Sequence, residues 1–468
     1  MFCIYLCSVS NFKCLNREIP AKFREDTSTM GKGCAARLLV PGLFAFCLGA
    51  AGLRAQQPPQ PTQLPGDIFV IKNTWFIGGA GAWDYLTMDT TSNRLFIAHD
   101  SVVQVVDVET GAVAGQVTGL HQAHYVVLDS AGQFGYVSDG LVNQVKIFDR
   151  QSLQVVASIA TGPGPRALAF DPQTGLLFVV CTTPLTEVQQ AEEASIAERA
   201  QPPHAPAPTA PRRTTPRTNV TSISVIDVTA RRRIGEILMP GRLGFAQADG
   251  NGQLFVLIAD RNQVARIDAG TIASLLHVQP DAAASTVPAD GPQSQSAAKP
   301  APAYAVLDWS RESRPPDSAA MQIFRLGSAC RAPLALAVDG AHQRVFAACD
   351  NMSLTVLNGG TGEVVTTLPI GPGPEAVGYD AGRGLIYTAN GDAQGTLTII
   401  RQDVTDTYNV IQNLATRQRA RTLAVDPDTG QVYLVTDYVG VNLSTPGGIG
   451  TLKSAPVAGS FQVLAVGH

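Results

Sequence analysis

Apolar residues in this chain fall in short runs, separated by tight turns rich in Gly, Pro and Asp. Thr161–Val180 shows the pattern in full: a Gly/Pro turn leads into Ala167–Phe170, the pentapeptide DPQTG follows, and a second apolar run, Leu176–Val180, comes directly after it. Pro fixes φ in this turn and Gly accepts a positive φ, so the pentapeptide reverses the chain. The segment therefore predicts a strand, a hairpin turn and a second strand.

The same hairpin pattern recurs along the chain, in three clear copies and three weaker ones. The copies are Pro333–Cys349, Glu375–Asn390, Arg421–Asp437, Asp84–Asp100, His124–Asp139 and Gly244–Asp260. Further strand signals follow the hairpins, as in Val102–Val108 and Ala112–Val117, which flank a Glu-Thr-Gly turn. Each repeat thus holds four antiparallel strands over about 40–46 residues, a period typical of propeller blades. Such sheets bury their faces by stacking on their neighbours around an axis.

The two ends of the repeat array complement each other. After its hairpin, the last repeat contains one more strand signal, Ser460–Val466, while Ile68–Ile77 is a strand without a repeat. We expect the N-terminal strand to complete the last sheet, because closure removes exposed sheet edges. The sequence therefore predicts an all-β fold over residues 67–468, a seven-bladed β-propeller of four-stranded antiparallel blades closed by its N-terminal strand.

The first 66 residues form a separate region, because they do not share the repeat pattern. A small basic region after Met30, the short apolar run Leu38–Leu53 and a candidate cleavage site at Ala55 have the layout of a secretory signal peptide. We expect residues 1–29 to be an upstream extension, 30–55 a signal peptide and 56–66 a Pro-rich linker. The protein is then periplasmic or secreted; the alternative is that the leader is retained as a membrane anchor.

Two repeats are longer than the others because of insertions. Residues 184–219, with a helix-like run at Leu185–Ala200, separate the second and third strands of the third repeat. Residues 280–316 separate the third and fourth strands of the next repeat. Both are rich in Ala and Pro, and we expect them to be disordered because such compositions bury little apolar surface.

Composition and motifs exclude several classes of function. A formal net charge of −4 and a pI of about 6.0 do not suit a nucleic-acid-binding protein. The sequence lacks Cys-x-x-Cys-His, Gly-x-Ser-x-Gly, His-Glu-x-x-His and a P-loop, so we expect no catalytic residue, metal or cofactor. His121 and His124 form a pair without a third metal ligand. We expect a monomer with no membrane span once the leader is cleaved.

Three cysteines remain after the leader: Cys181, Cys330 and Cys349. Cys330 precedes the first strand of one repeat and Cys349 ends the second strand, which places both at the same end of a blade. A Cys330–Cys349 disulfide suits an exported protein. Three buried thiols acting as small hydrophobic residues fit equally well.

The repeats resemble those of the YVTN family, exported bacterial seven-bladed propellers that include YncE-like proteins. The resemblance depends on Tyr387-Thr388-Ala389-Asn390, on the Gly-Pro-Gly-Pro segments at 162–165 and 371–374, and on the Asp-Pro turns at Asp171 and Asp426. It covers roughly Ile68–Val466. It implies architecture and export but says little about chemistry, because this fold hosts many functions.

Aligning the repeats places seven residues at one equivalent position, the start of the innermost strand. They are Asp84, His124, Arg166, Gly244, Leu334, Glu375 and Arg421. The five charged or titratable members, Asp84, His124, Arg166, Glu375 and Arg421, are our candidate ligand-binding residues. They could hold a small polar ligand at the mouth of the channel or position an acid and a base. Alternatively, they form ion pairs that hold adjacent blades in register.

A second set follows the second strand of each repeat. It comprises His99-Asp100, Asp139, Cys181, Asp260, Asp350, Asn390 and Asp437. Acidic oxygens on one face can bind a cation. Asp and Asn at a strand end also cap turns through backbone N–H groups, which is the interpretation we favour.

Two classes of function fit these observations. The first is a non-enzymatic exported scaffold that binds a protein or saccharide partner on its loop face. The alternative is a lactonase-like hydrolase that uses the charged ring at the channel mouth. A weaker alternative is a propeller that holds a non-covalent haem-type cofactor.

Overall fold

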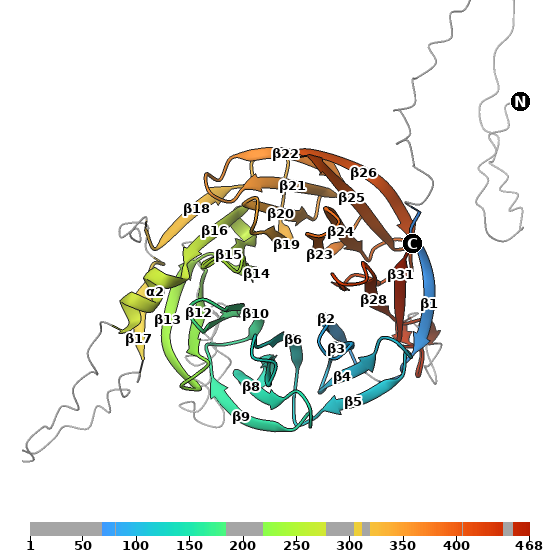
Figure 1. The fold of residues 1–468 in the computed structure, drawn as a ribbon, viewed down its shortest axis with the longest axis horizontal. Coiled ribbons are helices and arrows are strands. Elements are labelled where there is room, and N and C mark those ends of the chain that lie inside the picture. Colours follow the sequence, from blue (N-terminus) through green and yellow to red (C-terminus); the bar gives the residue numbers. More distant parts are fainter. Residues whose placement is uncertain are drawn as a thin grey trace, which may run out of the picture. The chain divides into compact units, whose positions relative to one another are not determined.

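Strands dominate the computed structural model, which describes residues 68–79, 81–183, 219–277, 304–310, 319–404, 406–442 and 453–468. Seven sheets surround a central axis, each with its first strand innermost (Figure 1). The predicted seven-bladed β-propeller of four-stranded antiparallel blades is confirmed. The proposed leader and linker and most of both insertions lie outside the described residues.

The blades are numbered here in chain order, and their strands run from the axis outward. Blade 1 contains β2 (Trp83–Asp89), β3 (Arg94–His99), β4 (Val102–Asp107) and β5 (Val113–Val117). Blade 2 contains β6 (Ala123–Leu128), β7 (Phe134–Asp139), β8 (Gln144–Asp149) and β9 (Val155–Ala160). Blade 3 contains β10 (Pro165–Asp171), β11 (Leu176–Cys181), β12 (Val220–Asp227) and β13 (Arg232–Pro240).

The remaining blades follow the same plan. Blade 4 contains β14 (Leu243–Ala248), β15 (Gln253–Ile258), β16 (Gln263–Asp268) and β18 (Met321–Arg325). Blade 5 contains β19 (Pro333–Asp339), β20 (Arg344–Cys349), β21 (Ser353–Asn358) and β22 (Val364–Pro369). Blade 6 contains β23 (Pro374–Asp380), β24 (Leu385–Asn390), β25 (Thr396–Val404) and β26 (Thr407–Ala415).

Blade 7 is assembled from both ends of the repeat array, as predicted. It contains β27 (Leu423–Val425), β28 (Val432–Thr436), β31 (Gln462–Gly467) and β1 (Val70–Phe76). β1 pairs antiparallel with β31, from Val70 opposite Gly467 to Phe76 opposite Gln462 (Figure 1). Phe69, next to β1, is fully buried against Tyr387 of blade 6, so the closing strand also joins two blades.

Apolar clusters fill the spaces between neighbouring blades. Trp83 and Leu95 of blade 1 share one cluster with Tyr433 and Val463 of blade 7. Phe346 of blade 5 shares another with Ile386 of blade 6. Burial between sheets, rather than within one sheet, thus holds the ring together.

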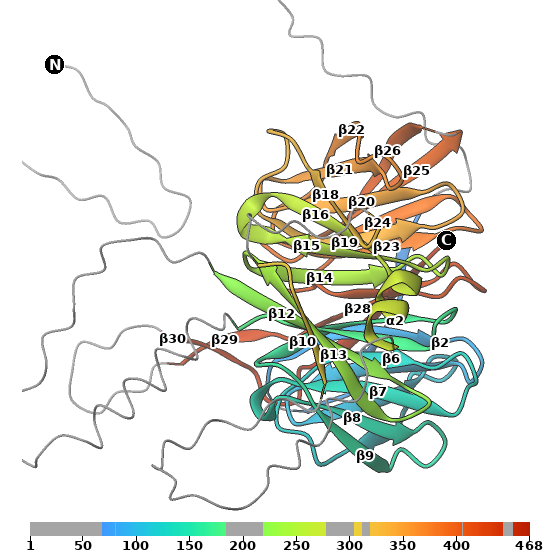
Figure 2. The ribbon, with the colours of Figure 1, turned by 90° about the vertical axis from the view of Figure 1, so that its left-hand side faces the viewer.

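Six elements among the described residues depart from the expected plan. The hairpin β29 (Val439–Asn442) and β30 (Lys453–Pro456) is inserted into blade 7 and projects from one side (Figure 2). Helix α2 (Ala269–His277) follows β16. Residues 280–316 were expected to be disordered, which is wrong for β17 (Ala305–Asp308), a strand that pairs with β13. Short 3-10 turns η1 (Gly140–Val142) and η2 (Ala259–Arg261) follow β7 and β15.

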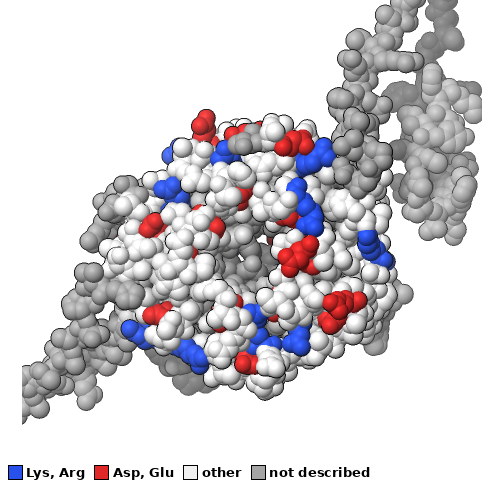
Figure 3. Space-filling model, in the orientation of Figure 1, with Lys and Arg blue, Asp and Glu red and all other residues white. Residues whose placement is uncertain are grey.

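A search of the described residues finds no helix with the length and hydrophobicity of a membrane span. The face shown in Figure 3 carries acidic and basic side chains interspersed, with no extended area of a single sign, and is hollowed at its centre.

Candidate functional site

A β-bulge sets the predicted ring of charged residues at the start of the innermost strands. In blades 3, 5 and 6 the register shifts after the first strand residue, and the unpaired position is Arg166, Leu334 or Glu375. An extra residue in one strand re-aims its side chain. The equivalent positions of these repeats therefore leave the regular pairing of the sheet.

In blades 1, 2 and 4 the bulge leaves the following residue without a pairing partner as well. The pairing passes from Trp83 to Leu86, from Ala123 to Val126 and from Leu243 to Ala246. Each gap contains an aromatic residue at its second position, and these are Tyr85, Tyr125 and Phe245. These three blades contain the three weaker copies of the hairpin pattern in the sequence.

Three of the five candidate residues form one network, in which His124 and Arg166 both contact the carboxylate of Asp84. Asp84 Oδ2 lies 2.8 Å from His124 Nδ1 and 2.9 Å from Arg166 Nη2. The Asp84 side chain is only 10% exposed, whereas that of Arg166 is 46% exposed. The network joins blades 1, 2 and 3, as the ion-pair interpretation requires, and leaves part of the Arg166 guanidinium facing solvent.

Glu375 and Arg421 form the second network, between blades 6 and 7. Arg421 Nε lies 3.2 Å from Glu375 Oε2, and its Nη1 donates to Oε1 at 3.3 Å. The guanidinium also lies 6.0 Å from the ring centroid of Trp83 in blade 1. Burial raises the pKa of Glu375 above its ordinary value, although the charge of Arg421 opposes this shift. The structure thus brings all five candidates into two paired networks; a ligand-binding role for them stays a prediction.

Tyr85, Tyr125 and Phe245, each one residue after a position of the predicted ring, form an aromatic cluster. The ring centroids lie 5.3 Å apart for Tyr85 and Tyr125, and 4.9 Å and 5.6 Å from Phe245. Such separations are typical of favourable edge and tilted contacts. Burial raises the pKa of Tyr125 to about 12. Sequence reasoning missed this cluster, although the alternation of a ring residue and an aromatic residue in three repeats could have indicated it.

A cavity of about 280 Å³ follows the aromatic cluster along the channel. Its wall is formed by the aromatic cluster on one side and by small residues of blades 5 to 7 on the other, among them Ala337, Gly378 and Ala424. None of the five charged candidates lines it. The cavity is therefore lined by residues next to the charged candidates, among them Tyr85 and Tyr125, and not by the candidates themselves.

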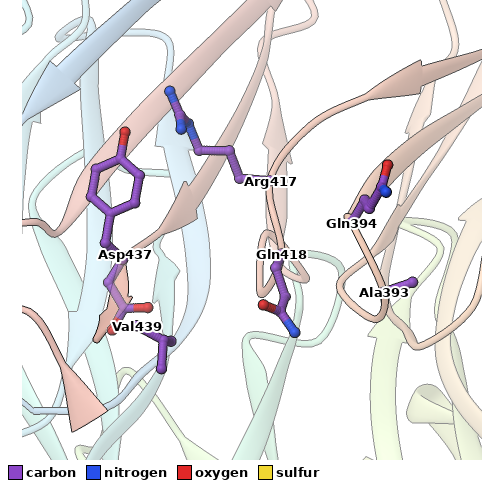
Figure 4. A pocket seen from close by; sticks show the side chains of 7 residues that line it. Ala393, Gln394, Arg417, Gln418, Asp437 and Val439 are labelled. Atoms are coloured by element: carbon purple, nitrogen blue, oxygen red, sulfur yellow. The ribbon is translucent and has the colours of Figure 1, made fainter. Parts of the chain in front are cut away.

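A larger pocket, of about 410 Å³, lies between the loops of blades 6 and 7. It is lined by Ala393 and Gln394 after β24, by Arg417 and Gln418 before β27, and by Asp437–Val439 after β28. Figure 4 shows Arg417 and Gln418 between Gln394 on one side and Asp437 and Val439 on the other. We call it the loop-face pocket. Alternating arginines in the sequence TRQRART mark one wall, a signal that sequence reasoning did not use.

The fold of these blades also occurs in solved structures. A chain of the mitotic checkpoint complex matches with a TM-score of 0.52 and 14% identity, over 85% of this chain and 96% of that chain. U3-55K matches with a TM-score of 0.54 and 10% identity, over 83% and 97%. The WD40 repeats of RRP9 match with a TM-score of 0.53 and 10% identity, over 84% and 96%. The chain has the propeller fold of WD40 repeats. No family model and no curated protein matches it.

Two members of the second set of polar residues, Asp139 and Asp260, cap loops of the propeller. Asp139 accepts hydrogen bonds from the backbone N–H groups of His121 and Gln122, at 3.1 and 2.9 Å. Asp260 accepts one from the N–H of Arg242 at 2.8 Å. The capped N–H groups belong to the loop before the first strand of the same blade. Across the described part of the chain, no group of three or more His, Cys, Asp or Glu side chains could hold a metal ion.

The cysteines resolve the two alternatives that the sequence left open. Cys330 and Cys349 form a disulfide, with their Cα atoms 5.4 Å apart. Cys181 is a buried free thiol. Burial raises the pKa of this thiol to about 11, so it is not a reactive thiolate at neutral pH.

Proposed function

We propose that the protein is an exported propeller of the YVTN type that acts as a binding scaffold in the cell envelope. The family and the location are supported by the sequence, through the tetrad at 387–390 and the leader pattern at 30–55. Binding on the loop face is supported by the loop-face pocket. The observation that carries the proposal is that the Arg417 guanidinium in this pocket lies on the Tyr438 ring and has no carboxylate partner among the described residues.

Arg417 differs from the two arginines that follow it in the same loop. Arg419 Nη1 lies 3.2 Å from Asp437 Oδ1, and Arg421 pairs with Glu375. No carboxylate of the described residues lies within ion-pair distance of Arg417, whose guanidinium carbon lies 5.1 Å from the ring centroid of Tyr438. A guanidinium placed on an aromatic ring is partly oriented before a ligand arrives.

The loop that carries Arg417 is fixed by hydrogen bonds to both blades. Thr416 N donates to Gly395 O at 3.0 Å, and Arg419 N donates to Gly391 O at 2.7 Å. Thr436 Oγ1 donates to Gln418 O at 2.8 Å. Gly395 has a φ of +77°, and a side chain there would collide with the Arg417 carbonyl oxygen. The pocket is therefore preorganised, which reduces the entropy lost on binding.

An acidic saccharide fits this chemistry best. Its carboxylate can take a bidentate hydrogen bond from Arg417. Gln394 and Gln418 are exposed amides that can bond hydroxyl groups from either side, and Tyr438 offers an apolar ring. A neutral saccharide lacks the charged contact and should bind more weakly.

Titration calorimetry with a uronate oligosaccharide and its neutral counterpart tests this function. Arg417→Gln should weaken uronate binding roughly 10- to 100-fold, the value of a charge-assisted hydrogen bond. Arg231→Gln is the matched control, because that guanidinium lies 4.4 Å from the Phe134 ring on another blade, and it should bind as the wild type does. Equal binding of the neutral sugar, or no effect of Arg417→Gln, would rule out the proposed pocket.

A lactonase-like hydrolase remains the second candidate. It is supported by one contact, the Asp84–His124 pair at 2.8 Å, since a carboxylate orients a histidine that acts as a base. Turnover of lactones or esters by the purified protein, abolished by His124→Gln, would favour it over the scaffold. A coloured preparation with a Soret band would favour the haem-type alternative.

Export has its own test. Expression of the full chain in a Gram-negative host, followed by mass spectrometry of the purified protein, should give an N-terminus directly after Ala55. A protein that keeps residues 38–53 and stays with the membrane fraction would support the retained anchor instead.

A further inference from the structure

The outer edge of blade 3 differs from the outer edges of the other six described blades. In those, the outermost strand has no further neighbour, whereas β13 pairs with β17. β17 runs parallel to β13, from Gly235 opposite Ala305 to Leu238 opposite Asp308, while the other described strand pairs are antiparallel. Trp309 N continues the ladder by donating to Leu238 O at 2.9 Å.

Two charged side chains of β13 hold the residue before β17. The Arg233 guanidinium carbon lies 3.8 Å from the ring centroid of Tyr304. The Tyr304 hydroxyl donates to Glu236 Oε2 at 3.2 Å, and Arg233 Nη2 lies 2.7 Å from Glu236 Oε1. Arg233 and Glu236 both belong to blade 3. Together they form a binding site for an aromatic side chain that comes from outside the four strands of this blade.

The segment alternates between a buried and an exposed face. Ala305, Leu307 and Trp309 pack against the apolar cluster between blades 3 and 4, whereas Val306 is 39% exposed. In the sequence, Tyr304–Trp309 is a short apolar motif flanked by residues rich in Ala, Pro and Ser. Its pattern is an aromatic residue followed by apolar residues at alternate positions, which suits an extended strand.

We propose that the outer edge of blade 3 is a strand-addition site for an extended peptide, and that residues 304–309 are its occupant from within the chain. β13 is nine residues long and β17 only four, so a longer partner strand can form more main-chain hydrogen bonds than β17 does. Main-chain bonds give affinity in such complexes, and alternate side chains give specificity. The partner is an extended segment with the pattern of Tyr304–Trp309. The site lies on blade 3 and is independent of the loop-face pocket of blades 6 and 7.

A variant that loses the internal strand but keeps the edge tests this proposal. Tyr304→Ala, Leu307→Asp and Trp309→Ala are combined, and binding of a fluorescein-labelled peptide of residues 304–310 is followed by anisotropy. The variant should bind at least tenfold more tightly than the wild type, because a tethered occupant competes at an effective concentration on the order of millimolar. Adding Arg233→Gln should weaken binding roughly fivefold, the value of a cation–π contact. A scrambled peptide is the control.

Hydrogen exchange on the wild-type protein is a second test, which does not depend on the folding of the triple variant. Excess peptide should speed exchange of the Val306 and Leu307 amides and leave β13 protected. The proposal is overturned if a folded triple variant binds no peptide, if it binds the scrambled peptide equally, or if the peptide leaves exchange unchanged. Concentration-dependent dimerisation that the triple variant loses would identify the occupant as a second copy and overturn the separate partner.

Discussion

Asp84 is the side chain on which three blades converge. Its Oδ2 atom serves both His124 and Arg166, and the carboxylate is almost fully buried. Removing one partner of a buried charge leaves the others without compensation, which destabilises more than losing an exposed pair. Glu375 and Arg421 form such an exposed pair on the same ring, with side chains 40% and 35% exposed.

We therefore predict that Asp84→Asn lowers the free energy of unfolding by about 1–3 kcal/mol. Glu375→Gln is the matched control and should change it by less than about 1 kcal/mol. Urea unfolding followed by tryptophan fluorescence measures both. If the two substitutions have equal effects, the Asp84 network does not anchor the blades.

The disulfide of blade 5 gives the second residue-scale prediction. Cys330 and Cys349 are separated by 19 positions, and closing a loop of this size stabilises a fold by about 3 kcal/mol. The double variant Cys330→Ala/Cys349→Ala should melt at a lower temperature than the wild type and no longer respond to reductant. Cys181→Ala should keep the full response. A wild-type melting temperature that reductant does not change would contradict the assignment.

At the scale of elements, ring closure depends on a single strand and the residue before it. Phe69 is fully buried, and its backbone N–H and C=O bond Gln412 at 2.9 and 2.8 Å. Phe76, at the other end of β1, is 62% exposed. The same residue type thus occupies a core position and a surface position of one segment.

Phe69→Ala should therefore destabilise the propeller by about 3–5 kcal/mol, because it leaves a cavity between blades 6 and 7. Phe76→Ala should change stability by no more than about 0.5 kcal/mol. Thermal unfolding of both variants provides the comparison. Similar melting temperatures would mean that β1 contributes little to closure.

For the whole molecule, the ionised carboxylates predict how stability depends on pH. Six aspartates of the described residues have a folded-state pKa below the ordinary value: Asp89, Asp107, Asp149, Asp268, Asp403 and Asp406. The largest cause at Asp107 is a hydrogen bond from the backbone N–H of Thr110, and at Asp406 it is a hydrogen bond from the Arg344 side chain. Burial raises the pKa of two carboxyls, Glu375 and Asp437.

A lowered folded-state pKa contributes stability that is present above the unfolded value, near 3.9, and is lost as the pH falls through the folded value. Glu375 and Asp437 act in the opposite direction, but they are fewer. Stability should therefore change little from pH 7 to 5 and fall steeply below about pH 4. Urea titrations at each pH measure this. The combination Asp107→Asn/Asp149→Asn should make the fall shallower; a rise in stability below pH 4 would contradict the assignment.

The repeats made the architecture predictable, because each hairpin specifies its own strands through Asp-Pro and Gly turns and apolar alternation. Repeats that share this pattern stack in the same way around one axis. The number of blades and the closing strand therefore followed from the sequence. β17 could not be predicted in this way, since its four residues form a strand only because β13 offers an edge with Arg233 and Glu236 in place.

The sequence alone determined the fold and which residues share the start of the innermost strands, because those properties follow from local turn chemistry repeated seven times. Tertiary structure alone decided which charges meet. It placed Arg166 against Asp84 from two blades away, paired Arg419 with Asp437 and Arg421 with Glu375 while leaving Arg417 on Tyr438, and gathered three aromatic rings from blades 1, 2 and 4. These contacts join residues far apart in the chain, and their distances depend on how the blades stack around the axis, which no local pattern encodes.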